Sequence, residues 1–108
     1  MYVIPKFDFQ GTTWENVTVL FGTYVDGSPA IDLLCEDGDP LARATVCLES
    51  ISPETGCVLI KEWSENAGMV KALTEAGVIE PTGKVITVNQ WGSIAVEARV
   101  LIPMPEPR

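Results

Sequence analysis

The sequence predicts an α+β fold: a single antiparallel β-sheet, made of a meander and a C-terminal hairpin, with one α-helix packed on one face. Three observations predict this fold. Short runs rich in β-branched and aromatic residues recur along the chain and are typical of strands. Turn residues such as Asp-Gly separate these runs closely enough to favour antiparallel neighbours. One segment, residues 65–76, repeats its apolar side chains at helical spacing.

The first half of the chain predicts four strands joined by turns. We expect them at residues 2–9, 16–25, 30–35 and 41–48. The first should lie at an edge, because Pro5 has no N–H to donate to a neighbouring strand. Asp26-Gly27 supplies one turn and residues 36–40 supply another, since glycine adopts a positive φ without steric penalty. The three later strands therefore form the meander.

The second half predicts the helix and the C-terminal hairpin. A short strand over residues 57–63 precedes the helix, which Ser64 or Asn66 would cap and Gly77 would end. Residues 84–89 and 93–102 then read as a hairpin around Gln90-Trp91-Gly92. We expect one domain over residues 1–102 and an extended tail over 103–108, where three of six residues are proline.

The charge of the chain bears on its partners. Seven Lys and Arg against fifteen Asp and Glu give a net charge of −8. This balance argues against direct binding of nucleic acid or an anionic membrane, because both need clustered cations. It favours a protein partner with a basic surface. The alternative interpretation is that the charge only keeps a small protein in solution.

The residue types present also limit the chemistry. Histidine is absent, so the chain can form neither a Ser-His nor a Cys-His nucleophile pair, nor a histidine metal site. Cys35, Cys47 and Cys57 lie 12 and 10 residues apart and form no CxxC unit. We therefore expect that the protein is not an enzyme and that it binds neither a cofactor nor a metal ion. An odd number of cysteines, with no signal peptide at the start and no long apolar span, predicts a reducing cytoplasm.

Acidic and aromatic residues in turns are the candidate contacts with a partner. The candidate set is Glu36, Asp37, Asp39, Glu49, Glu54, Trp63 and Trp91. The acidic cluster at residues 36–39 would contact Lys or Arg of a partner, or would simply form a solvated turn. The two tryptophans would serve as apolar anchors. Alternatively, Trp63 packs over the sheet edge and Trp91 folds back onto the core, whereas Trp14 is expected in the core.

Two stretches of the chain carry recognisable motifs. Residues 24–48 contain Cys-Glu-Asp-Gly followed by Thr-Val, and residues 59–84 contain Trp-Ser-Glu-Asn followed by Thr-Gly. This combination resembles an uncharacterised bacterial domain family found in phages and conjugative elements. The matching positions are Tyr24, Gly27, Ala30, Ile31, Leu33, residues 35–38, Pro40, Ala42, Thr45, Val46, Leu48, Lys61, residues 63–66, Leu73, Gly77, Thr82 and Gly83. Cys47 departs from the family, which usually carries Asn there, and the hairpin around Trp91 replaces a short aromatic-rich ending.

The resemblance implies a class of function but transfers no catalytic residue. Short genes on mobile elements often encode inhibitors of host defence, so the first hypothesis is a non-enzymatic inhibitor of a CRISPR or restriction complex in the bacterial host, acting through an acidic surface. The second is a protein that sequesters a nucleotide signal. It would need an oligomer that brings five of the cations together at one interface, namely Arg43, Lys61, Lys71, Lys84 and Arg99. The third is a structural accessory module. Exposed edge strands would allow a homodimer in each case.

Overall fold

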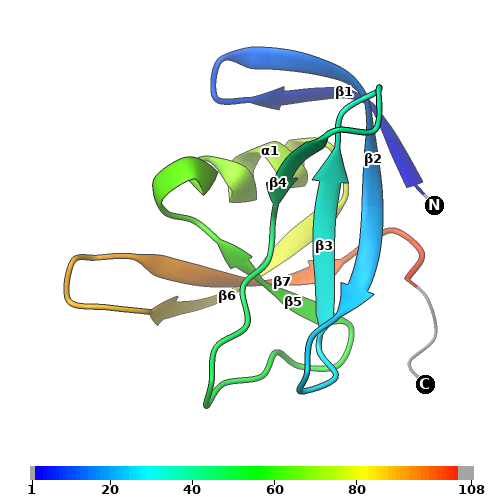
Figure 1. Cartoon of the computed structure of the whole chain (residues 1–108). Helices are drawn as coiled ribbons and strands as arrows, with labels where there is room; N and C mark the ends of the chain where they lie inside the picture. The colour runs from blue at the N-terminus through cyan, green and yellow to red at the C-terminus, as the bar shows by residue number, and fades with distance from the viewer. Residues whose placement is uncertain (1, 105–108) are drawn as a thin grey trace.

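Two antiparallel sheets joined by one short segment form the molecule (Figure 1). The computed structural model describes residues 2–104. The strands and helices are β1 (Tyr2–Phe9), β2 (Thr12–Thr23), β3 (Pro29–Leu34), β4 (Pro40–Arg43), β5 (Cys57–Lys61), a 3-10 turn η1 (Ser64–Asn66), α1 (Met69–Glu75), β6 (Ile79–Thr87) and β7 (Ile94–Val100). The first sheet has the order β1-β2-β3-β4 and the second has β5-β7-β6. The antiparallel α+β prediction is confirmed, but the strands form two sheets where one was expected.

The chain changes partner directly after β4, and this change divides the sheet. We call residues 44–46 the linking segment. The N–H of Ala44 still donates to the carbonyl of Ile31 in β3, at 2.9 Å, whereas the N–H of Val46 donates to the carbonyl of Leu59 in β5, at 3.0 Å. The expected strand over 41–48 is therefore too long. It ends at Arg43 because pairing then passes to the second sheet: the carbonyl of Ala44 accepts the N–H of Lys61, and Val46 pairs with Leu59.

The β1–β2 hairpin bends sharply near its middle and lies over α1 in Figure 1. On β1 the buried residues are Ile4, Phe7 and Phe9, so the inward side changes between residues 4 and 7. Asn16 on β2 takes a left-handed conformation with φ of 53°, which asparagine tolerates better than most residues. The bend turns Phe7, and Trp14 opposite it in the register, toward the centre of the molecule.

The helix α1 packs under this hairpin. Its C-terminal end agrees with the prediction from the sequence, whereas its N-cap does not. It buries Met69, Ala72 and Leu73 in the core, and Gly77 follows its last turn with a φ of 75°, as expected. Its N-cap is Gly68 rather than Ser64 or Asn66. The carboxylate of Glu62 accepts the N–H of Gly68 at 2.6 Å and that of Val70 at 2.7 Å. A negative side chain outside the helix therefore satisfies the first N–H groups.

Both outer edges of the sheets carry features that discourage strand addition. On β1 these are Pro5 and Lys6. On β6 they are Lys84 and a register irregularity between Pro81 and Val85. The β6–β7 hairpin projects away from the core as an arm (Figure 1). Residues 105–108 of the predicted tail lie outside the described residues. Within residues 2–104, no helix is long and apolar enough to cross a membrane.

Candidate functional site

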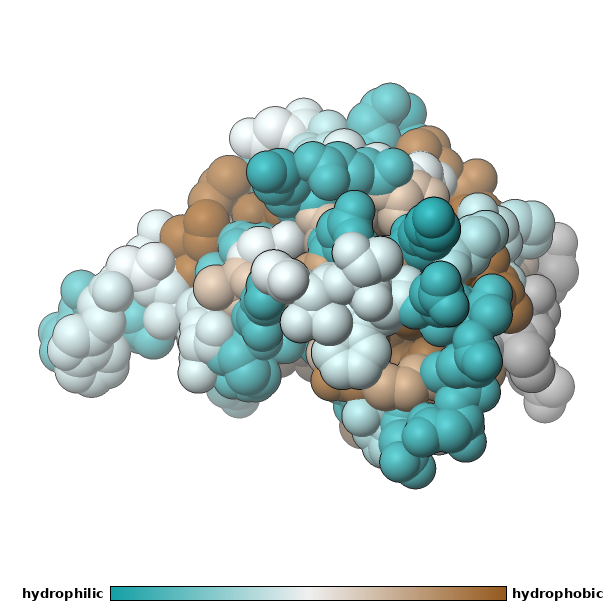
Figure 2. All heavy atoms as spheres, turned by 90° about the horizontal axis from the view of Figure 1, so that it is seen from above, coloured by the Kyte–Doolittle hydropathy of each residue, from teal (hydrophilic) through white to brown (hydrophobic). Residues whose placement is uncertain are grey.

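A shallow acidic depression lies between β2 and the β3–β4 turn. We call it the acidic groove, and its lining residues are Thr13, Trp14, Glu15, Cys35, Glu36 and Asp37. Three of these six side chains are carboxylates, and none is Lys or Arg. Figure 2 views the molecule from this end and shows hydrophilic side chains over much of the surface, with apolar side chains exposed between them. The groove therefore combines negative charge with an aromatic surface.

The turn that supplies two of these carboxylates is built by its own polar groups. The Asp37 carboxylate accepts the N–H of Asp39 at 3.0 Å, and Gly38 provides the positive φ that the turn requires, at 92°. Glu36 accepts a hydrogen bond from the side-chain amide of Asn16 on β2, at 2.6 Å. Asn16 therefore fixes the Glu36 carboxylate beside Glu15. Asp37 serves the turn as well as the groove.

The structure separates the other residues that were expected to contact a partner. Asp39 is exposed on the β3–β4 turn but does not line the groove. Glu49 and Glu54 are also exposed, on the loop before β5, which lies at the opposite end of the molecule from that turn in Figure 1. The acidic residues of the candidate set therefore form two separate groups rather than one face.

The two candidate tryptophans occupy different environments. Trp63 is half-buried just before η1, and the ammonium of Lys61 lies 5.2 Å from the centre of its ring. Trp91 is 80% exposed at the tip of the β6–β7 arm. The side chain of Asn89 accepts the N–H of Trp91 at 2.9 Å and that of Ser93 at 3.3 Å. Trp91 therefore projects into solvent from a hydrogen-bonded turn, and it does not fold back onto the core.

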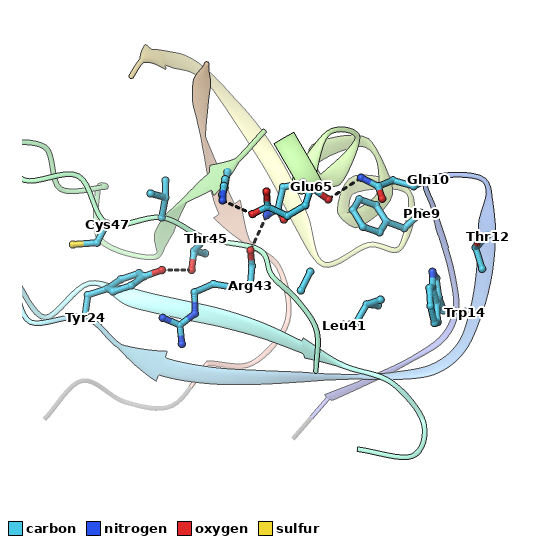
Figure 3. A pocket seen from close by; sticks show the side chains of 14 residues that line it. Phe9, Gln10, Thr12, Trp14, Tyr24, Leu41, Arg43, Thr45, Cys47 and Glu65 are labelled. Atoms are coloured by element: carbon cyan, nitrogen blue, oxygen red, sulfur yellow. Dashed lines mark hydrogen bonds and ion pairs between the residues drawn. The ribbon is translucent and has the colours of Figure 1, made fainter. Parts of the chain in front are cut away.

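A second groove lies at the seam of the two sheets and has a volume of about 540 Å³ (Figure 3). We call it the seam groove. Its lining residues are Phe9, Gln10, Thr12, Trp14, Tyr24, Leu41, Ala42, Arg43, Thr45, Val46, Cys47, Lys61, Glu65 and Asn66. Figure 3 shows Phe9, Thr12 and Trp14 at one end and Tyr24 and Cys47 at the other. Trp14 lines both grooves.

Hydrogen bonds hold the polar walls of the seam groove in place. The hydroxyl groups of Tyr24 and Thr45 share a hydrogen bond of 2.9 Å. Asn66, which was expected as a helix cap, is buried and donates its side-chain amide to the carbonyl of Arg43 at 2.7 Å. The side chain of Gln10 donates to the carbonyl of Glu65 at 2.8 Å, which ties the bent hairpin to η1. The groove is thus largely formed before any ligand enters.

Two cations line the seam groove, and each has an acidic partner. The guanidinium of Arg43 donates to both oxygens of Asp32, at 2.7 and 3.0 Å. The ammonium of Lys61 donates to Glu65 at 2.5 Å. These pairs orient the cations without using all of their N–H groups, since Arg has five and Lys has three.

The Lys61–Glu65 pair predicts an unusually acidic glutamate. The hydrogen bond from Lys61 lowers the pKa of Glu65 from 4.5 to about 2. A lowered pKa in the folded state means that the pair stabilises the fold fully above the ordinary pKa and is lost as the pH falls toward about 2. A carbon-detected NMR titration of the glutamate carboxyl groups should give a midpoint near 2 for Glu65. A midpoint that is already near 4.5, or that Lys61→Gln leaves unchanged, would contradict this assignment.

The remaining reactive groups lie apart from one another. Cys47 is exposed at the seam groove, Cys35 is half-buried in the acidic groove and Cys57 is buried in β5. Burial, and then the nearby Glu97 carboxylate, raise the pKa of the Cys57 thiol. Residues 2–104 hold no group of three or more Cys, Asp and Glu side chains placed to bind a metal ion. What the grooves offer chemically is a charged and aromatic surface for binding.

Of the six residues that line the acidic groove, the candidate set from the sequence held only Glu36 and Asp37. Trp14 was assigned to the core, and it does pack against the core while also lining both grooves. Glu15 was assigned to no site, because the strand was expected to begin at residue 16, whereas β2 begins at Thr12. The available signal was the sequence Thr-Thr-Trp-Glu directly after a glycine turn, which suits a strand with one apolar face.

Comparison of the chain with protein-family models, with curated proteins and with solved structures found no match.

Proposed function

We propose that this chain is a non-catalytic binding protein that attaches its acidic groove to a cationic group on another protein. The observation that carries the proposal is the composition of the groove, where three carboxylates lie beside Trp14 and no Lys or Arg lines the depression. Carboxylates attract a Lys or Arg side chain, and an indole adds a cation–π contact. A single groove thus offers both kinds of contact to one cationic side chain.

The net charge of the chain supports the same proposal. At −8, the field of the whole molecule attracts a basic surface and speeds the encounter with it. Glu36 is already held by Asn16, so less side-chain freedom is lost when it binds a partner. Asp39, close to the groove on the same turn, adds to the local charge.

The kind of partner follows from the resemblance described above. Relatives in phages and conjugative elements would place the protein in the cytoplasm of a bacterial host, as an inhibitor of a CRISPR or restriction complex. Such complexes bind nucleic acid in channels lined with Lys and Arg. An acidic domain of this size would occupy such a channel, or cover the surface beside it. This part of the proposal rests on association and not on the geometry of the groove.

Two variants with the same charge test whether the groove makes the contact. The first carries Glu15→Gln, Glu36→Gln and Asp37→Asn. The control carries Glu49→Gln, Glu54→Gln and Glu75→Gln, so each variant removes three negative charges from the net −8. We expect the groove variant to bind a partner captured from bacterial lysate about tenfold more weakly, and the control to bind within about twofold of the wild type. The amides keep the acceptor oxygens that Asn16 and Asp39 use.

The salt dependence completes this test. Binding through exposed charges should weaken between about 0.05 M and about 0.5 M salt, because the screening length falls to a few ångströms. Equal losses in the two variants would show that only net charge matters and would refute the groove as the contact. Binding that is insensitive to salt would refute the electrostatic basis altogether.

A further inference from the structure

We propose that the seam groove is a binding site for a small molecule in which a flat aromatic ring carries one anionic group, as in a nucleoside monophosphate. This inference does not rest on the carboxylates of the acidic groove or on its protein partner, although Trp14 lines both grooves. The volume of about 540 Å³ lies in the range of small-molecule pockets. Such pockets combine apolar walls with a few polar groups that fix orientation, and the seam groove has both.

The aromatic walls specify the flat part of the ligand. Phe9 and Trp14 line one end, and Tyr24 lines the other (Figure 3). Leu41 and Ala42 add apolar surface to the lining, and both pack against the core. A flat ring placed against an indole or phenol gains contact area and favourable stacking. The walls therefore favour a planar ligand over a flexible chain.

The cations specify the charged part. The chain has seven Lys and Arg in all, and two of them, Arg43 and Lys61, line this one groove. Asp32 and Glu65 hold the two cations in place. Each cation still has N–H groups that are free to donate hydrogen bonds to an anion. Two pre-positioned cations beside an aromatic wall suit a phosphate or carboxylate joined to a ring.

The negative charge of the whole chain does not prevent this binding. The Debye length is about 8 Å at physiological ionic strength, so distant carboxylates act only weakly on a ligand in the groove. Among the side chains that line the seam groove, Glu65 is the one carboxylate, and Lys61 already neutralises it. The acidic groove, in contrast, is lined by three carboxylates and would repel the same ligand.

NMR of the tryptophan indoles tests the proposal. The Nε1 of Trp14 is buried and has no hydrogen-bond partner among residues 2–104, so its proton should respond to a ring placed in the groove. The probes are adenosine monophosphate, uridine monophosphate and salicylate, each added up to about 5 mM so that millimolar affinity is detected. We expect a saturable shift of the Trp14 signal with at least one of them. The exposed Trp91 signal, identified with Trp91→Phe, should stay in place.

Two lysines that each form an ion pair with a glutamate of the same spacing provide the control. Lys61 pairs with Glu65 and Lys71 pairs with Glu75, each four residues along the chain. Lys61→Gln should weaken binding at least about fivefold, whereas Lys71→Gln should leave it within about twofold. Equal losses in both variants would overturn the proposal, as would no saturable shift with any probe. Adenosine binding as tightly as its monophosphate, or inorganic phosphate alone reproducing the shift, would also overturn it.

Discussion

Phe7→Ala should destabilise the protein by about 3–5 kcal/mol, the largest effect that we expect from a single substitution. Phe7 is fully buried, and the centre of its ring lies 5.7 Å from the centre of the Phe9 ring. It faces inward only because the β1–β2 hairpin bends. Removing the ring leaves a cavity between the hairpin and the core that neighbouring side chains cannot fill completely. For a domain of this size the midpoint of thermal unfolding should fall by about 15–25 °C.

Val3→Ala on the same strand is the matched control. Val3 is 44% exposed, so its truncation should change stability by no more than about 0.5 kcal/mol. Urea unfolding followed by circular dichroism measures both variants. Phe7→Ala should also alter the fluorescence of Trp14, its cross-strand neighbour, and thus report on the wall that the two grooves share. A loss below about 1 kcal/mol for Phe7→Ala would show that the bent hairpin contributes little to the fold.

Local signals explain why much of the fold was predictable. The strand expected over residues 2–9 matches β1, and that expected over 30–35 matches β3 within one residue. Turns after Asp26 and Cys35 use glycines with a positive φ, and the sequence identifies such turns directly. The helix was also found, although it is shorter than expected because η1 takes its first residues.

The division into two sheets follows from tertiary pairing and has no local signal. Residues 41–48 read as one strand because their side chains favour extended structure throughout. The change of partner at Ala44 depends on where β5 lies, and β5 begins at Cys57, thirteen residues further along the chain. The bend of the β1–β2 hairpin at Asn16 also has no local signal that would predict it. Asparagine tolerates the left-handed conformation, but the tolerance alone does not say that it will be used.

The same distinction applies to the candidate site. The density of carboxylates at residues 36–39 was visible in the sequence, and the structure places Glu36 and Asp37 in a groove. Their neighbours Trp14 and Glu15 come from β2, twenty or more residues earlier, and only the sheet brings them together. Glu49 and Glu54 follow the turn in sequence, but the loop carries them to the other end of the molecule.

Thr45→Val should cost about 2 kcal/mol, because the hydroxyl of Thr45 connects the two sheets. Thr45 is buried in the linking segment, and its Oγ1 accepts the backbone N–H of Ile31 in β3 at 3.0 Å. The same oxygen shares a hydrogen bond with the hydroxyl of Tyr24. Valine has nearly the same shape but no hydroxyl, so the variant leaves a buried N–H without its acceptor. Such a group loses its hydrogen bond to water on folding and gains nothing in return.

Two further variants separate the parts of this connection. Tyr24→Phe removes only the hydrogen bond at the seam groove and should cost less than about 1 kcal/mol, since the N–H of Ile31 keeps its acceptor. Thr45→Ser keeps the hydroxyl and should likewise lie closer to the wild type than Thr45→Val does. If chemical denaturation ranks Tyr24→Phe as the more harmful change, Thr45 serves mainly to orient Tyr24 in the groove. If Thr45→Val is the most harmful, as we expect, the main role of the Thr45 hydroxyl is structural. Its single buried oxygen then accepts the N–H of Ile31, in place of the strand partner that β3 loses where β4 ends.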